Sequence, residues 1–136
     1  MKKNMLYLAG ILILVLMLTG CVTRQQKTEK LRDLEFTVLD KEDVPQELKT
    51  AIVENMEQPF KLTFSDQGFT YIAEGYGPQQ KSGYSVKVTG LYETENAVYI
   101  HTELLGPEKG EKTKEVVTYP YVVVKMEMTD KNVVFD

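Results

Sequence analysis

The chain has 136 residues, with 16 basic and 20 acidic side chains and a formal net charge of −4. An acidic chain of this length predicts one domain, and its charge disfavours nucleic acid and anionic lipid headgroups as partners. A single histidine and a single cysteine exclude a disulfide framework and leave too few ligands for a zinc site. The sequence therefore predicts no metal, no cofactor and no nucleic-acid partner.

Residues 1–20 have the pattern of an export signal. Lys2 and Lys3 precede a largely apolar run that starts at Met5 and leads into Leu18-Thr19-Gly20-Cys21. A basic start, a short apolar stretch and small residues before the cut are typical of a secretory signal peptide. The alternative is an uncleaved membrane anchor, but the run is shorter than the roughly 20 residues that span a bilayer. Because a cysteine follows the cut, the segment resembles a bacterial lipoprotein signal.

This resemblance implies that residues 1–20 are removed and that the thiol of Cys21 receives a diacylglycerol. Two acyl chains anchor a protein stably without a spanning helix. Residues 21–30 are otherwise polar and predict a flexible tether, and residues 31–136 predict a single domain. We expect this domain to lie at the outer face of the cell membrane, or in the cell envelope, held there by the lipid on Cys21.

The domain opens with a predicted strand and the one helix that the sequence supports. Apolar and polar residues alternate from Leu34 to Val38, which is the period of a strand. Pro45 then precedes a helical pattern of about 11 residues that ends before Pro59. The apolar residues that recur at helical spacing are Leu48, Ala51, Ile52 and Met56.

After Pro59 the period changes to that of strands, and the stretch from Gly106 to Lys114 is charged and predicts a solvated loop. The sequence therefore predicts an α+β fold, with one helix followed by a mostly antiparallel sheet of about six short strands. An open sheet and a partly closed barrel are both compatible with this pattern. The predicted strands lie at 60–64, 69–75, 84–89, 98–104, 116–119 with 121–128, and 133–135.

Groups that could carry out catalysis are sparse. His101 is the only histidine, and strand alternation places it on a polar face with Tyr99 and Glu103. The chain has no nucleophile-elbow pattern, and a Ser-His-Asp site needs a serine and a carboxylate converging on the imidazole. The sequence predicts no catalytic residue and no enzyme. A small hydrolase that uses Ser82 or Ser85 with His101 is the disfavoured alternative.

Tyrosine, glycine and proline gather in two segments, Gly75–Tyr84 and Thr118–Tyr121. Two tyrosines on either side of a proline cannot both enter one core, and tyrosines on loops are enriched in binding surfaces. We expect Tyr76 to point outward from a turn and Tyr84 to enter the core in register with the next strand; core positions for single tyrosines are the competing interpretation. The predicted partner-binding residues are Tyr76, Gly77, Pro78, Ser82, Gly83, Tyr119, Pro120 and Tyr121.

The same segments carry a family resemblance. Tyr71-Ile72-Ala73-Glu74-Gly75, then Gly83-Tyr84-Ser85-Val86-Lys87-Val88, then Pro107, then the run from Val117 to Val124 are similar to the C-terminal domain of PrcB-like proteins. These proteins are lipoproteins named for a subunit of a surface protease complex, and the resemblance covers roughly Val44 to Met128. The family commonly has two glycines before the tyrosine, where this chain has Ser82-Gly83.

The resemblance implies a non-catalytic partner that assists or stabilises an extracellular subtilisin-like protease. The leading hypothesis is therefore a lipid-anchored, extracytoplasmic protein-binding module with an extracellular serine protease as partner. A protease inhibitor that presents the loop 76–82 is one alternative. A structural envelope lipoprotein is another.

Overall fold

The computed structural model describes residues 29–136, so the predicted signal peptide and Cys21 lie outside the described residues. The helical elements are a short 3-10 helix η1 (Lys41–Asp43) and the helix α2 (Gln46–Asn55). The strands are β1 (Arg32–Asp33), β2 (Thr37–Val38), β3 (Pro59–Asp66), β4 (Phe69–Tyr76), β5 (Ser85–Glu93), β6 (Ala97–Leu105), β7 (Tyr121–Glu127) and β8 (Asn132–Phe135). Within residues 29–136, no helix has the length and apolar character needed to cross a membrane.

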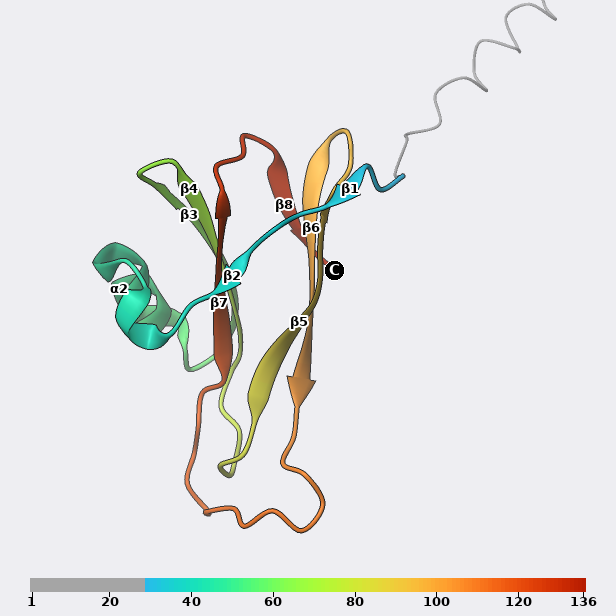
Figure 1. Ribbon diagram of the computed structural model, residues 1–136. Helices are drawn as coiled ribbons and strands as arrows, with labels where there is room; N and C mark the ends of the chain where they lie inside the picture. Colours follow the sequence, from blue (N-terminus) through green and yellow to red (C-terminus); the bar gives the residue numbers. More distant parts are fainter. Residues whose placement is uncertain (1–28) are drawn as a thin grey trace, which may run out of the picture.

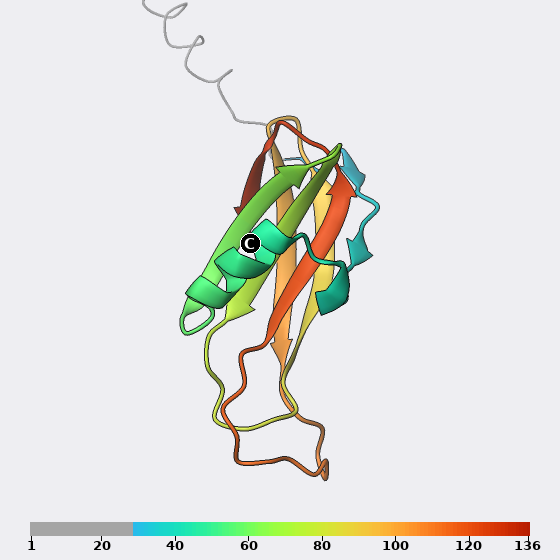
Figure 2. The ribbon, with the colours of Figure 1, turned by 90° about the vertical axis from the view of Figure 1, so that its left-hand side faces the viewer.

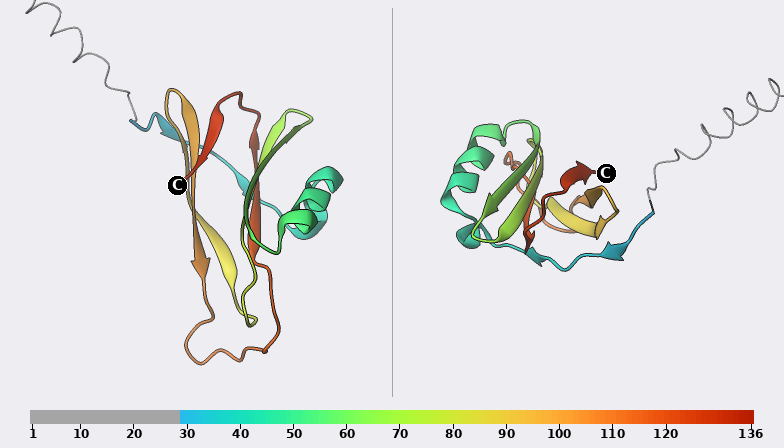
Figure 3. Two further views of the ribbon diagram at one scale, coloured as in Figure 1. Left: turned by 180° about the vertical axis from the view of Figure 1, so that it is seen from behind. Right: turned by 90° about the horizontal axis from the view of Figure 1, so that it is seen from above.

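The strands form two four-stranded sheets that face one another (Figures 1 and 3). The first sheet has the order β1-β5-β6-β8 and the second the order β2-β7-β4-β3. Pairing is antiparallel except between β6 and β8, which run parallel. The α+β class is confirmed, but the prediction of one sheet of about six strands is wrong, and the sheets do not close into a barrel. Alternation identifies which residues face a core, and it carries no information on how strands divide between two sheets.

The first core lies between the two sheets. The predicted inward row of β6 is confirmed, because Val98, Ile100 and Thr102 are buried and Leu104 is half-buried. The register of β5 against β6 shifts between Val88 and Gly90, which is a β-bulge. The buried apolar residues of this core are Ile72, Leu91, Val98, Ile100, Val122, Val124 and Met126.

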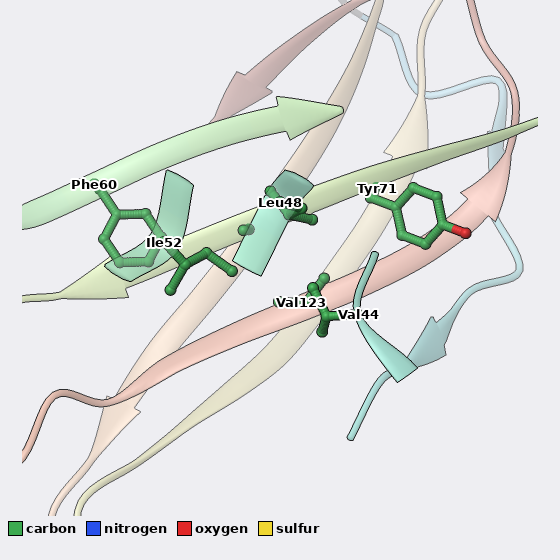
Figure 4. Packing of buried hydrophobic residues seen from close by; sticks show 7 residues of the cluster. Val44, Leu48, Ile52, Phe60, Tyr71 and Val123 are labelled. Atoms are coloured by element: carbon green, nitrogen blue, oxygen red, sulfur yellow. The ribbon is translucent and has the colours of Figure 1, made fainter. Parts of the chain in front are cut away.

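The second core lies between α2 and the outer face of the second sheet (Figures 2 and 4). Leu48 and Ile52 of α2 are each 2% exposed and pack over β3, β4 and β7. Both faces of β4 and β7 are therefore covered, which explains why Val122–Val124 is a continuous apolar run rather than an alternating one. The predicted helix is confirmed as the ten residues of α2, with Pro45 at its N-cap. The residues of this core are Val44, Leu48, Ile52, Phe60, Tyr71, Ala73 and Val123.

Two predicted strands differ from the structure. The alternating segment near Leu34 is not one strand, because β1 pairs with β5 and β2 pairs with β7, so the chain passes from one sheet to the other. Residues 116–119 do not form a strand, and only Thr118 pairs there, in a single bridge to Gln79. The predicted last strand is confirmed as β8. The alternation near Leu34 correctly predicted extended backbone. It did not predict which strands β1 and β2 pair with, because tertiary contacts decide the pairing.

Candidate functional site

The two tyrosine-containing segments lie side by side at one end of the sandwich, the lower end in Figure 1. We call this region the loop end and define it as residues 77–84, which join β4 to β5, and residues 106–120, which join β6 to β7. Three backbone–backbone hydrogen bonds and one from a side-chain hydroxyl join the two loops. The hydrogen bonds run from Gln79 N to Thr118 O (2.8 Å), from Thr118 N to Gln79 O (2.9 Å), from Ser82 N to Lys114 O (3.0 Å) and from Thr118 Oγ1 to Lys81 O (2.9 Å).

Ser82 and Gly83 fix the approach of these loops. The Ser82 hydroxyl oxygen accepts a hydrogen bond of 2.8 Å from the backbone N–H of Lys114. Gly83 has a φ of +95°, and a Cβ at that position would lie 2.8 Å from Cβ of Pro107. Only glycine combines that left-handed backbone with so close a neighbour. The segment Gly75–Tyr84 is therefore bound to the loop 106–120 and helps to position it.

A groove of about 360 Å³ lies where the two sheets meet the loop end. Tyr84 lies at this groove and is half-buried, so the prediction of a core position for Tyr84 is wrong. Alternation places Tyr84 on the same face of the sheet as Val86 and Val88. The two valines pack against the core between the sheets, whereas Tyr84 lies outside that core. The lining residues are Val38, Leu39, Lys41, Tyr84, Ser85, Val86, Thr118, Tyr119, Pro120, Tyr121 and Val122.

Tyr121 forms the boundary between this groove and the helix side of the second sheet. Its ring lies 6.3 Å from the ring of Phe60, at a tilt of 47°. The ammonium of Lys41 lies 5.5 Å from its ring centroid, in the arrangement of a cation–π contact. Burial raises the pKa of the Tyr121 phenol. Tyr121 therefore presents an uncharged phenol and an aromatic face at neutral pH.

Tyr76 does not point outward, which corrects the prediction for this residue. It is the last residue of β4, and its hydroxyl lies 2.5 Å from Oγ1 of Thr102 on β6. Thr102 in turn donates to a carboxylate oxygen of Glu74 at 2.8 Å. The Tyr76 N–H also donates to the carbonyl of Pro120 at 3.2 Å. Tyr76 thus joins the two sheets and the start of β7.

The remaining predicted residues divide between the loop tip and the interior. Pro78 is exposed at the turn that follows β4, whereas Gly77 is buried beside Pro59. Tyr119 and Pro120 are half-buried and line the groove. The structure therefore brings Tyr119, Pro120 and Tyr121 together at the groove and assigns packing or hydrogen-bonding contacts to Tyr76, Gly77, Ser82 and Gly83. A partner-binding role for this set stays a prediction.

The sequence interpretation missed exposed apolar side chains in the loop end. Val116 and Val117 are 53% and 47% exposed, and Leu105 at the end of β6 is 40% exposed. The sequence predicts a strand at the two valines because they precede an apolar run. Their position in the sequence indicates a loop instead, because they directly follow the charged stretch and precede Pro120, which has no N–H to donate to a neighbouring strand. Val116 and Val117 thus add exposed apolar surface to the loop end.

The serines and the histidine considered for catalysis do not meet. His101 is exposed on the outer face of β6, with its Nδ1 3.0 Å from the carbonyl of Asp136. Ser85 pairs with Leu105, four residues along β6 from His101, which corresponds to about 13 Å. Ser82 is engaged with Lys114. Across residues 29–136, no three His, Cys, Asp or Glu side chains gather where they could hold a metal ion.

Comparison with known families bears on this arrangement directly. Residues 70–127 match the family model described as PrcB C-terminal. The predicted resemblance to the PrcB family is confirmed. The PrcB-type segment runs from β4 to β7 and so contains both loops of the loop end and most of the groove. No curated protein and no solved structure matches the chain.

Proposed function

We propose that this protein is a lipid-anchored, non-catalytic protein-binding module outside the cytoplasm that assists or stabilises a secreted subtilisin-like protease. The PrcB-type segment supports a broad association with a protease complex. The lipid on Cys21, the extracellular location and the protease as partner are proposals that follow from the lipoprotein-like signal and the family resemblance.

One observation carries the binding role. The family match covers the two loops that bind one another at the loop end, and with them most of the tyrosine-lined groove and the exposed Val116 and Val117. Loops held on a rigid sandwich are common places for recognition. Tyrosines contribute large contact areas to protein interfaces at low cost in conformational entropy. The loop end and the groove above it are therefore the proposed partner-binding surface.

The position of the N-terminal segment agrees with an anchored module. The described chain enters at β1, which pairs with Tyr92 and Glu93 at one end of β5, and the loop end joins β5 at Ser85 (Figure 1). The nine residues of β5 separate these ends by roughly 26 Å. A lipid attached ahead of β1 would leave the loop end facing away from the membrane.

The inhibitor alternative places the loop 76–82 in a protease active site. Protease-inhibitor loops need an accessible stretch of backbone, but Tyr76 and Ser82 are committed to hydrogen bonds within the domain. Between them, Pro78 and Gln80 are the exposed residues. This geometry favours an assisting role over an inhibitory one, and the direction of the effect on protease activity distinguishes the two.

Co-purification tests the proposal. The full chain, tagged at its C-terminus, is captured from detergent-solubilised envelopes, and the captured proteins are assayed for peptidase activity and identified. We expect a serine protease to be retained by the wild-type chain and by His101→Ala, and to be lost from a Val116→Glu, Val117→Glu variant that still folds. Retention of no protease by the wild-type chain would contradict the proposal, and retention of an inactive protease that regains activity on release would support an inhibitor.

A further inference from the structure

The N-terminal segment of the chain pairs as extended backbone with the edges of β5 and β7, on one side of the sandwich. Residues 31–39, which we call the strap, run extended along the edge of β5 and then cross to the edge of β7 (Figures 1 and 3). The strap is largely exposed, and only Leu34 and Leu39 pack against the cores. Backbone hydrogen bonds outside its short strands run from Leu31 N to Glu93 O (2.8 Å), from Leu34 N to Leu91 O (2.9 Å) and from Leu39 N to Val123 O (2.9 Å).

Beyond the strap, both edges lack a strand partner among the described residues. On its side facing away from β6, β5 pairs with β1 only at Tyr92 and Glu93, so residues 85–90 have no neighbouring strand there. On its side facing away from β4, β7 pairs with β2 only at Val124 and Lys125, which leaves Tyr121 and Val122 unpaired. The free part of β5 is about 20 Å long and accommodates about six extended residues.

The groove lies between these two free edges and begins where the strap turns away, at Val38, Leu39 and Lys41. Its lining includes Tyr84, Tyr119 and Tyr121 together with Val86 and Val122. Among its lining residues Lys41 is the only charged one, although the protein as a whole is acidic. Lys41 takes part in none of the ion pairs within residues 29–136.

We propose that the groove binds an extended segment of a partner protein, which adds as a strand to the free edge of β5 below the strap. Strand addition of this kind takes its affinity from backbone hydrogen bonds and its specificity from the pockets that receive alternate side chains. Apolar side chains of the segment enter between the three tyrosines, and a carboxylate lies beside Lys41. This inference rests on the proposed binding function and assigns to it a site and a binding mode.

The other long edge of the fold is less suited to this mode. β3 is the last strand of the second sheet and begins at Pro59, which has no N–H to donate to an added strand. Proline at an edge opposes pairing with another chain. Exposed charges occur on both edges, Lys61 and Asp66 on β3 and Lys87 in the free part of β5, so the proline is the feature that separates them. The free edge of β5 has the tyrosine-lined groove beside it instead.

Hydrogen exchange with defined peptides tests the proposal on the full chain in detergent micelles. The probe is a capped peptide of about six residues that alternates valine with threonine and carries one glutamate; a copy with lysine in place of glutamate is the charge control. We expect the glutamate peptide to slow amide exchange at residues 85–90 and 121–122, and to bind about threefold more tightly than the lysine peptide. The Lys41→Gln variant should lose this preference, and the matched Lys49→Gln variant on α2 should keep it.

Three results would overturn the assignment. These are slowed exchange along β3 instead of β5, no slowing with either peptide at millimolar concentration, and groove protection that arises from a second copy of the chain without peptide. The Tyr119→Ala variant separates this inference from the proposed function. If it folds and still retains the protease, the groove is not the binding site, whereas failure of the wild-type chain to retain any protease removes the proposed function itself.

Discussion

Tyr76 of β4 donates a hydrogen bond across the sandwich to Thr102 of β6, with 2.5 Å between the two hydroxyl oxygens. The direction follows from the next bond in the series, because the single hydroxyl hydrogen of Thr102 goes to the Glu74 carboxylate at 2.8 Å. The sheets are therefore joined by a polar chain at the end where the loops begin. Tyr76, which the sequence predicts to point outward, therefore makes a hydrogen bond inside the sandwich, and its predicted role in partner binding stays a prediction.

Removing this phenol should destabilise the fold. The Tyr76→Phe variant leaves the buried Thr102 without its donor, and we expect a loss of about 1 kcal/mol in the free energy of unfolding. Tyr99→Phe is the matched control, since Tyr99 stacks on Tyr92 on the outer face of the first sheet and should change stability by less than about 0.5 kcal/mol. Urea denaturation of both variants measures the difference. Equal stabilities of Tyr76→Phe and wild type would show that the inter-sheet bond contributes nothing.

Gly75 is required by the ring of Phe60. A Cβ at position 75 would lie 2.1 Å from Cε1 of that ring, on the helix side of β4. We expect Gly75→Ala to cost about 2 kcal/mol by overpacking, measured by thermal or urea unfolding. The cost should shrink in a Phe60→Leu background, because the clashing ring is then absent. Gly90→Ala, whose Cβ would meet only Cβ of His101 at 3.7 Å, is the control, and an equal cost at both glycines would contradict this explanation.

Glu93 couples the stability of the N-terminal segment to pH. It accepts hydrogen bonds from Lys131 Nζ at 3.0 Å and from Arg32 Nε, and these two cations lower its pKa below the usual value. A carboxyl whose folded-state pKa is lowered stabilises the fold at pH values above its unfolded pKa, and that stabilisation is lost as the pH falls through the folded pKa.

The Glu93→Gln variant should therefore be less stable than wild type near pH 7, and the difference should shrink as the pH is lowered below about 4.5. Unfolding measured from pH 7 to pH 3 checks this, and added salt should reduce the difference at neutral pH because the bridges to Arg32 and Lys131 are partly exposed. A difference that is independent of pH would mean that the charge of Glu93 is not responsible.

The proposed lipid anchor depends on one thiol. The Cys21→Ala variant should accumulate as an uncleaved or mislocalised precursor and should take up no labelled fatty acid, because the group proposed to receive the lipid is absent. Thr19→Ala keeps a small residue before the cut and should be labelled and fractionated like wild type. Normal labelling of Cys21→Ala would show that the lipoprotein interpretation of residues 1–21 is wrong.

Periodicity predicted local structure well in this chain. The alternation of Val98, Ile100 and Thr102 located the inner face of β6, and the spacing of Leu48 and Ile52 located the buried face of α2. The division into two sheets was not predicted, because an alternating apolar pattern is the same whether a strand pairs within one sheet or the other. The short strands β1 and β2 illustrate this, since a single alternating segment pairs with both sheets.

The candidate site was predicted by composition and corrected by contacts. The two tyrosine-rich segments do lie together, but Tyr76 turns inward to Thr102 and Tyr84 lies at the groove rather than in a core. Both errors occur beside strand ends, where the face of a side chain follows from alternation but the extent of its burial depends on how far the opposite sheet reaches. Ser82 shows the converse case: where the family commonly has glycine, its hydroxyl accepts from Lys114 and holds the loops together.

The lifetime of the proposed partner protease tests the central claim most directly. A subtilisin-like protease retained by the full chain is incubated alone and with an excess of the purified chain, and its intact fraction and peptidase activity are followed over time. We predict that the chain lengthens the lifetime of the intact, active protease, and that the Val116→Glu, Val117→Glu variant does not. A lifetime that the wild-type chain leaves unchanged, or an activity that it abolishes, would contradict a module that assists or stabilises the protease.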